Sequence, residues 1–186
     1  MTTSKLRRIC LVGVRGVGKT TLIRSVVNRL PDIDYIVGSA VLRELAGADF
    51  ARFDHLPPEV KEQYRHDAIT WMQERQARVG KHILCDGHTA LLDESTGKVG
   101  MVFTERDRGF FREIVLLEAP VEVILAHRQG DTSKIRSLDP HVIAAEVSAE
   151  GACSRLIAEE SSMQLHHLTL CNDGAAALRL VELLTP

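Results

Sequence analysis

A chain of 186 residues, with 45% hydrophobic and 26% charged residues, has the composition of a single globular domain long enough to bury a core. Its formal net charge of −2 gives no general attraction to nucleic acid or anionic membranes, so neither is expected as a partner. The N-terminal residues leave no room for a signal peptide, and no apolar run approaches the roughly 18 residues of a membrane helix, which predicts a cytoplasmic protein.

The first predicted strand leads into a phosphate-binding motif. Residues 8–12 form a short apolar run typical of a buried parallel strand, and residues 21–30 carry apolar side chains at helical spacing. Between them the sequence fits G-x-x-x-x-G-K-T, the P-loop pattern, in which Lys19 reaches the β- and γ-phosphates and Thr20 binds Mg²⁺. We expect Lys19 to face solvent at the nucleotide. The motif predicts a nucleoside triphosphate site made by Gly13, Arg15, Gly16, Val17, Gly18, Lys19, Thr20 and Thr21.

The next segment carries candidate acceptor-binding residues. Residues 35–37 read as a short strand, and a short helix opens at Ser39. Ser39 fits either an N-cap or a ligand contact, while Arg43 lies one turn further on, where a phosphate-bearing substrate could be held. A long charged helix over residues 58–79 is predicted from its start signal Pro57-Pro58.

A third apolar run, residues 82–86, ends at an aspartate. Asp86 fits the carboxylate that holds Mg²⁺ or its water opposite Thr20, and equally fits an N-cap or turn residue. His88 follows at the carboxyl edge of the strand, where such sheets bind ligands, although a packing role is the alternative. Residues 94–100 have no strong periodicity and read as a loop or a hairpin.

The second half of the chain continues the alternation of strands and helices. Strands are predicted over residues 113–118 and 165–171, and helices over 121–127, 140–162 and 175–184. Strands that alternate with helices form a parallel sheet covered on both faces. The predicted fold class is therefore α/β, a P-loop NTPase with a five-stranded parallel sheet flanked by helices.

Basic residues gather between the helices that follow the fourth strand. Arg128, Lys134 and Arg136 lie within one segment, and Arg155 follows on the next helix. Such a run is either a solvated face or a lid whose arginines stabilise the charge of a transferring phosphoryl group.

Together these segments resemble the adenylate kinase-like nucleoside monophosphate kinases, and most closely their archaeal-type branch. The resemblance implies that Arg43 binds the phosphate of a monophosphate and that Arg128 and Arg136 are catalytic lid arginines. It also implies acceptor contacts from Ser39, His88 and Arg155, and adenine contacts from the loop at Asn172. Because the bacterial branch has an arginine near the position of His88, protonation of this histidine is expected to improve acceptor affinity as the pH falls from about 8 to about 6.5.

The expected function is transfer of the γ-phosphoryl group of Mg²⁺-ATP to a small acceptor, with a nucleoside monophosphate, AMP first, as the acceptor. Lys19, Arg128, Arg136 and Asp86 are the expected catalytic residues, in a single domain 1–186 with an acceptor-binding arm at about 39–80 and a lid at about 128–138. Two alternatives stay open: a kinase for another small metabolite, and an ATP-hydrolysing switch that acts on a protein partner. The absence of an N-K-x-D guanine motif weighs against GTP.

Overall fold

The computed structural model describes residues 6–93, 96–131, 136–170 and 174–185. Its centre is a five-stranded parallel sheet in the order β2-β3-β1-β6-β7. The strands are β1 (Arg8–Val12), β2 (Ile33–Val37), β3 (His82–Asp86), β6 (Glu113–Glu118) and β7 (Gln164–Thr169). The predicted fold class is confirmed.

The central strands form because their apolar runs are buried on both faces. Ile9, Leu11 and Val12 of β1 are fully buried between β3 and β6. The two edge strands deviate most from the expected bounds. Strand β2 begins at Ile33, earlier than the expected start at residue 35, because Ile33 pairs with His82 and packs into the core. Strand β7 ends at Thr169.

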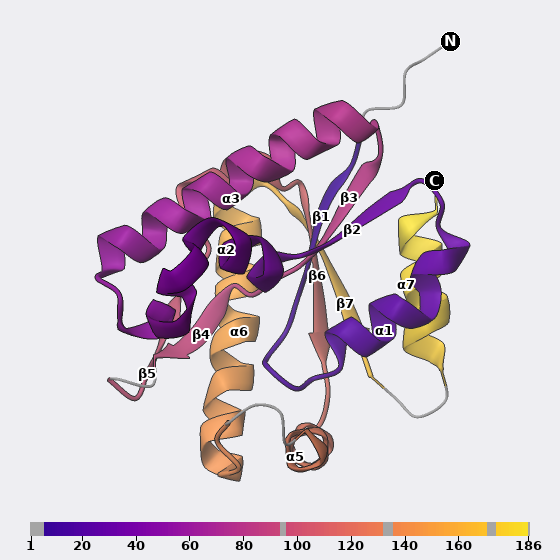
Figure 1. Ribbon diagram of the computed structural model, residues 1–186. Helices are drawn as coiled ribbons and strands as arrows, with labels where there is room; N and C mark the ends of the chain where they lie inside the picture. The colour runs from indigo at the N-terminus through magenta and orange to yellow at the C-terminus, as the bar shows by residue number, and fades with distance from the viewer. Residues whose placement is uncertain (1–5, 94–95, 132–135, 171–173, 186) are drawn as a thin grey trace.

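Two apolar layers cover the sheet (Figure 1). On one face, Ile9 and Leu11 pack with α1 (Lys19–Val26) and α7 (Ala175–Leu184), which lie side by side. On the other face, Cys10 and Val12 pack with α3 (Pro58–Val79) and α4 (Glu105–Phe110). Helix α6 (Pro140–Ser161) contributes to both layers, because its first half packs on one cluster and its second half on the other.

Two of the remaining helices follow the carboxyl ends of strands β2 and β6. Helix α2 (Gly38–Ala46) and the 3₁₀ segment η2 (Gly47–His55) pack beside α3 (Figure 1). The three elements include the segment 39–80, whose role as an acceptor-binding arm stays a prediction. Helix α5 (Val121–Gly130) follows β6. The short 3₁₀ segment η1 (Val27–Arg29) directly follows α1 and precedes β2.

A β-hairpin and a short helix lie between β3 and β6. Strands β4 (Ala90–Asp93) and β5 (Lys98–Met101) pair antiparallel around the segment expected to be a loop or a hairpin. Helix α4 was not predicted, since it has only 6 residues, and it is stabilised by a capping box between Thr104 and Asp107. Within the described ranges, no helix combines the length and apolar character needed to cross a membrane.

Candidate functional site

The P-loop runs from β1 to α1 in a conformation that requires glycine. Gly13, Gly16 and Gly18 have φ values of 149°, 90° and 110°. A Cβ at Gly13 would also collide with the carbonyl oxygen of Leu117 in β6. The loop therefore packs directly against the end of the neighbouring strand, which fixes its position at the carboxyl edge of the sheet.

Lys19, at the start of α1, lies inside this loop. Its side chain is 6% exposed, and Nζ donates to the carbonyl oxygens of Gly13 and Val14 and lies 3.9 Å from Asp86 Oδ1. The expectation that Lys19 faces solvent is wrong, because the loop's own carbonyl groups surround its ammonium. Burial lowers the pKa of Lys19, while the nearby carboxylates of Asp86 and Glu150 oppose that shift.

Thr20 and Asp86 face each other across the edge of the sheet. The Thr20 hydroxyl donates to Asp86 Oδ2 at 2.8 Å, and the Tyr35 hydroxyl approaches the same oxygen at 3.4 Å. Burial, with the charge of Asp86, raises the pKa of Tyr35 to about 12, so the phenol stays a proton donor. Hydroxyl and carboxylate oxygens are ligands that Mg²⁺ prefers, and Mg²⁺ bound to nucleotides takes few protein ligands. The pair fits the predicted magnesium site.

A cleft of about 1500 Å³ opens from the P-loop toward the arm. The predicted site residues that line it are Arg15, Gly16, Gly18, Lys19, Thr20, Thr21, Ser39, Arg43, Asp86, His88 and Arg136. Four others do not line it: Gly13, Val17, Arg128 and Arg155. Asn172 lies outside the described residues. The cleft thus brings together the nucleotide-binding motif and the candidate acceptor residues, which are separate in the sequence.

Arg128 packs against the P-loop and does not line the cleft. Its side chain is 1% exposed, and its guanidinium donates to the carbonyl oxygen of Arg15 at 2.8 and 3.0 Å, to that of Ser137 and to Glu146 Oε2. The alternative that this residue lies on a solvated face is therefore wrong. Here Arg128 supports the loop, and its catalytic role stays a prediction.

The other two predicted arginines differ in their surroundings. Arg136 pairs with Asp131 at 3.0 Å and lines the cleft, with its side chain 14% exposed. Arg155 is exposed on α6 and does not line the cleft. An acceptor contact by Arg155 therefore stays a prediction.

His88 occupies the cleft wall beside the P-loop. Burial lowers its pKa well below the usual value, and the positive charges of Lys19, Arg15 and Arg136 add to this effect. The expected protonation of His88 between about pH 8 and 6.5 is therefore wrong, since the imidazole stays neutral over this range. Its Nδ1 lies 3.8 Å from Glu150 Oε1 and has no hydrogen-bond partner in the described part of the chain.

We expect His88 to destabilise the fold at low pH. The unfolded imidazole takes up a proton below about pH 6.5, whereas the folded one does not, so the free energy of unfolding falls as the pH decreases. For one proton the slope is at most about 1.4 kcal/mol per pH unit. Urea unfolding of wild type and His88→Gln at several pH values measures this slope. Identical slopes of the free energy of unfolding against pH in the two proteins would contradict a lowered pKa of His88. Between about pH 6.5 and 8, acceptor affinity should show the same pH dependence in both proteins.

Sequence reasoning missed two groups at this site. Arg65 of α3 lines the cleft with Phe50 and Phe53, and its position within a charged helix gave no signal that it faces inward. Glu150 of α6 is 1% exposed and receives three backbone hydrogen bonds. Its partners lie 60 to 137 residues away along the chain, so local patterns do not reveal it.

A P-loop after β1, an aspartate at the end of β3 and this strand order define a P-loop nucleoside triphosphate-binding protein with the fold of a kinase. The chain belongs to the family described as AAA domain, which matches residues 12–143, more than half of its length. None of the curated proteins compared with the chain matches it.

Solved kinase structures share the fold along nearly the whole chain. A shikimate kinase from Bacteroides thetaiotaomicron is 15% identical with a TM-score of 0.57, and the match covers 97% of this chain and 99% of that one. A sugar kinase from Janibacter sp. HTCC2649 is 18% identical with a TM-score of 0.58, covering 96% and 94%. A gluconokinase from Sinorhizobium meliloti 1021 is 13% identical with a TM-score of 0.53, covering 96% and 95%. At these identities the likeness concerns the fold.

Proposed function

We propose that this protein transfers the γ-phosphoryl group of Mg²⁺-ATP to a nucleoside monophosphate such as AMP. The observation that carries the proposal is the single cleft that joins Lys19, Thr20 and Asp86 to Arg43 and Arg65. In phosphoryl transfer, catalysis consists mainly of positioning the two substrates and stabilising charge. Lys19 and Arg136 are the positive groups suited to that task, and Thr20 and Asp86 would hold Mg²⁺, which neutralises phosphate charge.

The size of the cleft favours two substrates over one. Sites for one small molecule commonly measure about 300–1000 Å³, and this cleft is about 1500 Å³. A switch needs room for its nucleotide alone, whereas a kinase needs room for a nucleotide and an acceptor. The volume therefore supports a kinase over an ATP-hydrolysing switch.

The acceptor end of the cleft combines positive charge with aromatic rings. Arg43 lies 4.7 Å from the centre of the Phe50 ring, and Arg65 lies 5.9 Å from that of Phe53. In the described part of the chain, no carboxylate lies within ion-pair distance of either guanidinium, and burial lowers the pKa of Arg65. Guanidinium groups bind phosphate in a bidentate fork, and flat rings stack on bases. This chemistry suits a phosphate monoester with a planar part.

The cleft carboxylates also favour an acceptor that is already ionised. A hydroxyl acceptor must lose a proton to a base, whereas the phosphate of a monophosphate carries negative charge at neutral pH. Asp86 accepts from Thr20, Asp107 accepts from Thr104 and Asp131 pairs with Arg136. Three of the cleft carboxylates thus already have a hydrogen-bond or ion-pair partner and are less available as a base. This supports a phosphate acceptor, which needs no base, over a hydroxyl acceptor.

A kinase for a hydroxyl-bearing metabolite is the second candidate. It is favoured by the fold likeness to a shikimate kinase, a sugar kinase and a gluconokinase, which extends over at least 96% of this chain. For this reaction Asp86 or the exposed Asp54 would have to accept the hydroxyl proton.

An acceptor screen separates these functions. Purified protein with ATP and Mg²⁺ is mixed with each common ribo- and deoxyribonucleoside monophosphate, with adenosine and with phosphate-free sugars and acids, and ADP formation is followed. We expect AMP or another monophosphate to stimulate turnover strongly and adenosine to do so poorly. Stimulation only by a phosphate-free metabolite would favour the second candidate. Hydrolysis indifferent to every acceptor would favour the switch.

Arg43→Ala is expected to weaken acceptor binding and to spare ATP. Loss of a charge-assisted hydrogen bond costs about 1.5–3 kcal/mol, which is roughly a 10- to 100-fold rise in the acceptor Kd. Isothermal titration with each ligand separately measures the two affinities. Arg52→Ala is the matched control, because Arg52 belongs to the same arm but is 71% exposed and does not line the cleft. Equal weakening of both ligands by Arg43→Ala would contradict the two-site assignment.

A further inference from the structure

The carboxylate of Glu150, in the middle of α6, receives hydrogen bonds from two distant segments. Oε1 accepts from the backbone N–H of Gly13 at 3.0 Å and from that of Thr89 at 3.0 Å. Oε2 accepts from the backbone N–H of Ala90 at 2.6 Å. One side chain thus joins the first residue of the P-loop to the segment that follows β3.

A buried carboxylate is costly, which makes these bonds informative. Glu150 is 1% exposed, and burial raises its pKa, although its three backbone donors and nearby Lys19 act in the opposite direction. A glutamine cannot replace it without loss. Its amide nitrogen would face at least one backbone N–H group, since both carboxylate oxygens are acceptors in the native arrangement.

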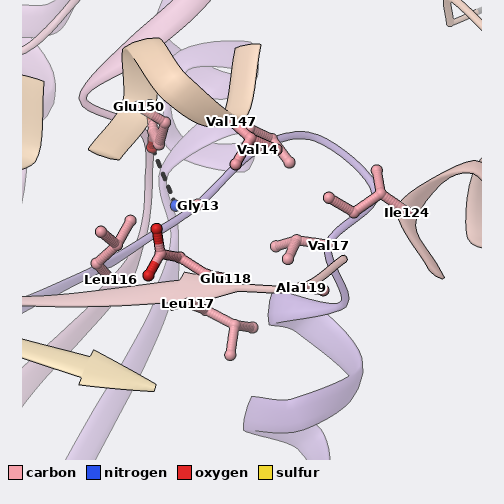
Figure 2. Close-up of a pocket in the computed structure, with 10 residues that line it drawn as sticks. All are labelled: Gly13, Val14, Val17, Leu116, Leu117, Glu118, Ala119, Ile124, Val147 and Glu150. Carbon is pink, nitrogen blue, oxygen red and sulfur yellow. Dashed lines mark hydrogen bonds between the residues drawn. The ribbon is translucent and has the colours of Figure 1, made fainter. Parts of the chain in front are cut away.

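Behind the P-loop, the packing leaves little room for movement (Figure 2). The cavity there measures about 10 Å³, and Val14, Val17, Ile124 and Val147 close around it. One turn before Glu150, Glu146 holds Arg128, which in turn holds the carbonyl oxygen of Arg15. Helix α6 therefore supports the loop at two points.

The other segment held by Glu150 forms the acceptor side of the cleft. Thr89 and Ala90 connect His88 to hairpin strand β4, and both His88 and Leu91 line the cleft. The side chain of Thr89 is also fixed, because its hydroxyl contacts the carbonyl oxygen of Glu150 at 3.1 Å and Ser154 Oγ at 3.0 Å. A shift of Glu150 would therefore move the cleft wall relative to the phosphate loop.

We propose that Glu150 is a positioning residue that sets the acceptor side of the cleft at a fixed distance and orientation from the P-loop. The proposal deepens the function proposed above and rests on it for its kinetic consequence. Because Gly13 and Thr89 share one carboxylate oxygen, a nucleotide that immobilises the P-loop is also expected to immobilise residues 89 and 90.

The test begins with hydrogen exchange, which requires no catalysis. In the wild-type protein, Mg²⁺-ADP is expected to slow exchange of the Thr89 and Ala90 amides about fivefold or more, the scale of ordinary coupling between sites. In Glu150→Gln this slowing should be lost although ADP still binds. Glu159→Gln is the matched control, because it makes the same substitution at an exposed position of the same helix and leaves the Glu150 carboxylate and Thr89 intact. If ADP leaves the wild-type amides unprotected, or protects them equally in Glu150→Gln, the proposal is overturned.

Steady-state kinetics gives the second measurement. Glu150→Gln is expected to lower kcat about tenfold or more at saturating substrates, with the Kd of ADP changed much less, because alignment rather than binding is lost. A lower melting temperature with unchanged kcat per folded molecule would overturn the positioning role. If the wild-type protein transfers phosphoryl to no acceptor, the proposed function fails, whereas the exchange experiment still decides whether Glu150 couples the two segments.

Discussion

Replacing Lys19 by methionine is expected to lower the rate of phosphoryl transfer about 100-fold or more, the usual scale for a group that stabilises transition-state charge. Methionine keeps much of the length of the side chain and removes its charge. In the structure the ammonium lies between the P-loop carbonyl groups and Asp86, so it is already held where phosphate oxygens would arrive. Measuring kcat at saturating ATP and acceptor tests this expectation.

The melting temperature of Lys19→Met must be measured beside its activity. Lys19 is buried, so removing its charge affects both the carbonyl groups it binds and the nearby carboxylate. Lys81→Met is the matched control, since Lys81 is exposed and does not line the cleft. A folded Lys19→Met protein with near-wild-type turnover would refute the assigned role.

Asp86→Asn is expected to raise the Mg²⁺ concentration needed for half-maximal activity about tenfold or more, the scale on which metal sites respond to altered ligands. Asparagine can still accept the hydrogen bond from Thr20, but it lacks the charge that attracts a hard cation. The activity of the variant should therefore recover in part at high Mg²⁺, and a Mg²⁺ titration of turnover measures this recovery.

Asp139→Asn provides a control for this substitution. Asp139 is the exposed N-cap of α6, and asparagine caps helices about as well as aspartate. The control variant should keep the wild-type Mg²⁺ dependence. An Asp86→Asn protein with the same dependence would show that Asp86 is a turn residue, which is the alternative that the sequence left open.

Local patterns predict the parts of the fold whose causes are local. Strands β1, β3 and β6 have the expected bounds because each is a continuous apolar run buried on both faces. Helix α3 also has its expected bounds, since Pro58 favours its start and Gly80, with φ of 66°, ends it. The start of β2 could not be predicted, because it depends on pairing with His82, far along the chain.

The same distinction applies to the site. The P-loop and the facing Thr20 and Asp86 follow from residue types at fixed positions around strand ends. The position of the Arg128 side chain could not be predicted in this way. It depends on tertiary contacts with Glu146 and with the carbonyl oxygen of Arg15, which local sequence patterns do not reveal. The role of Glu150 could not be predicted either, since glutamate in a helix is usually exposed. Only the packed structure brings three backbone N–H groups to its carboxylate.

Helix α7 determines how far the chain can be shortened. The side chains of Leu180 and Leu184 are 0% and 2% exposed. They belong to the same apolar cluster as the buried side chains of α1, the helix that carries Lys19. Burying two leucines contributes about 3–6 kcal/mol, a large share of the roughly 5–15 kcal/mol that keeps an ordinary domain folded. A protein truncated before Ala175 would thus lose the support beneath its nucleotide-binding helix, although the deleted segment contains none of the residues assigned to catalysis.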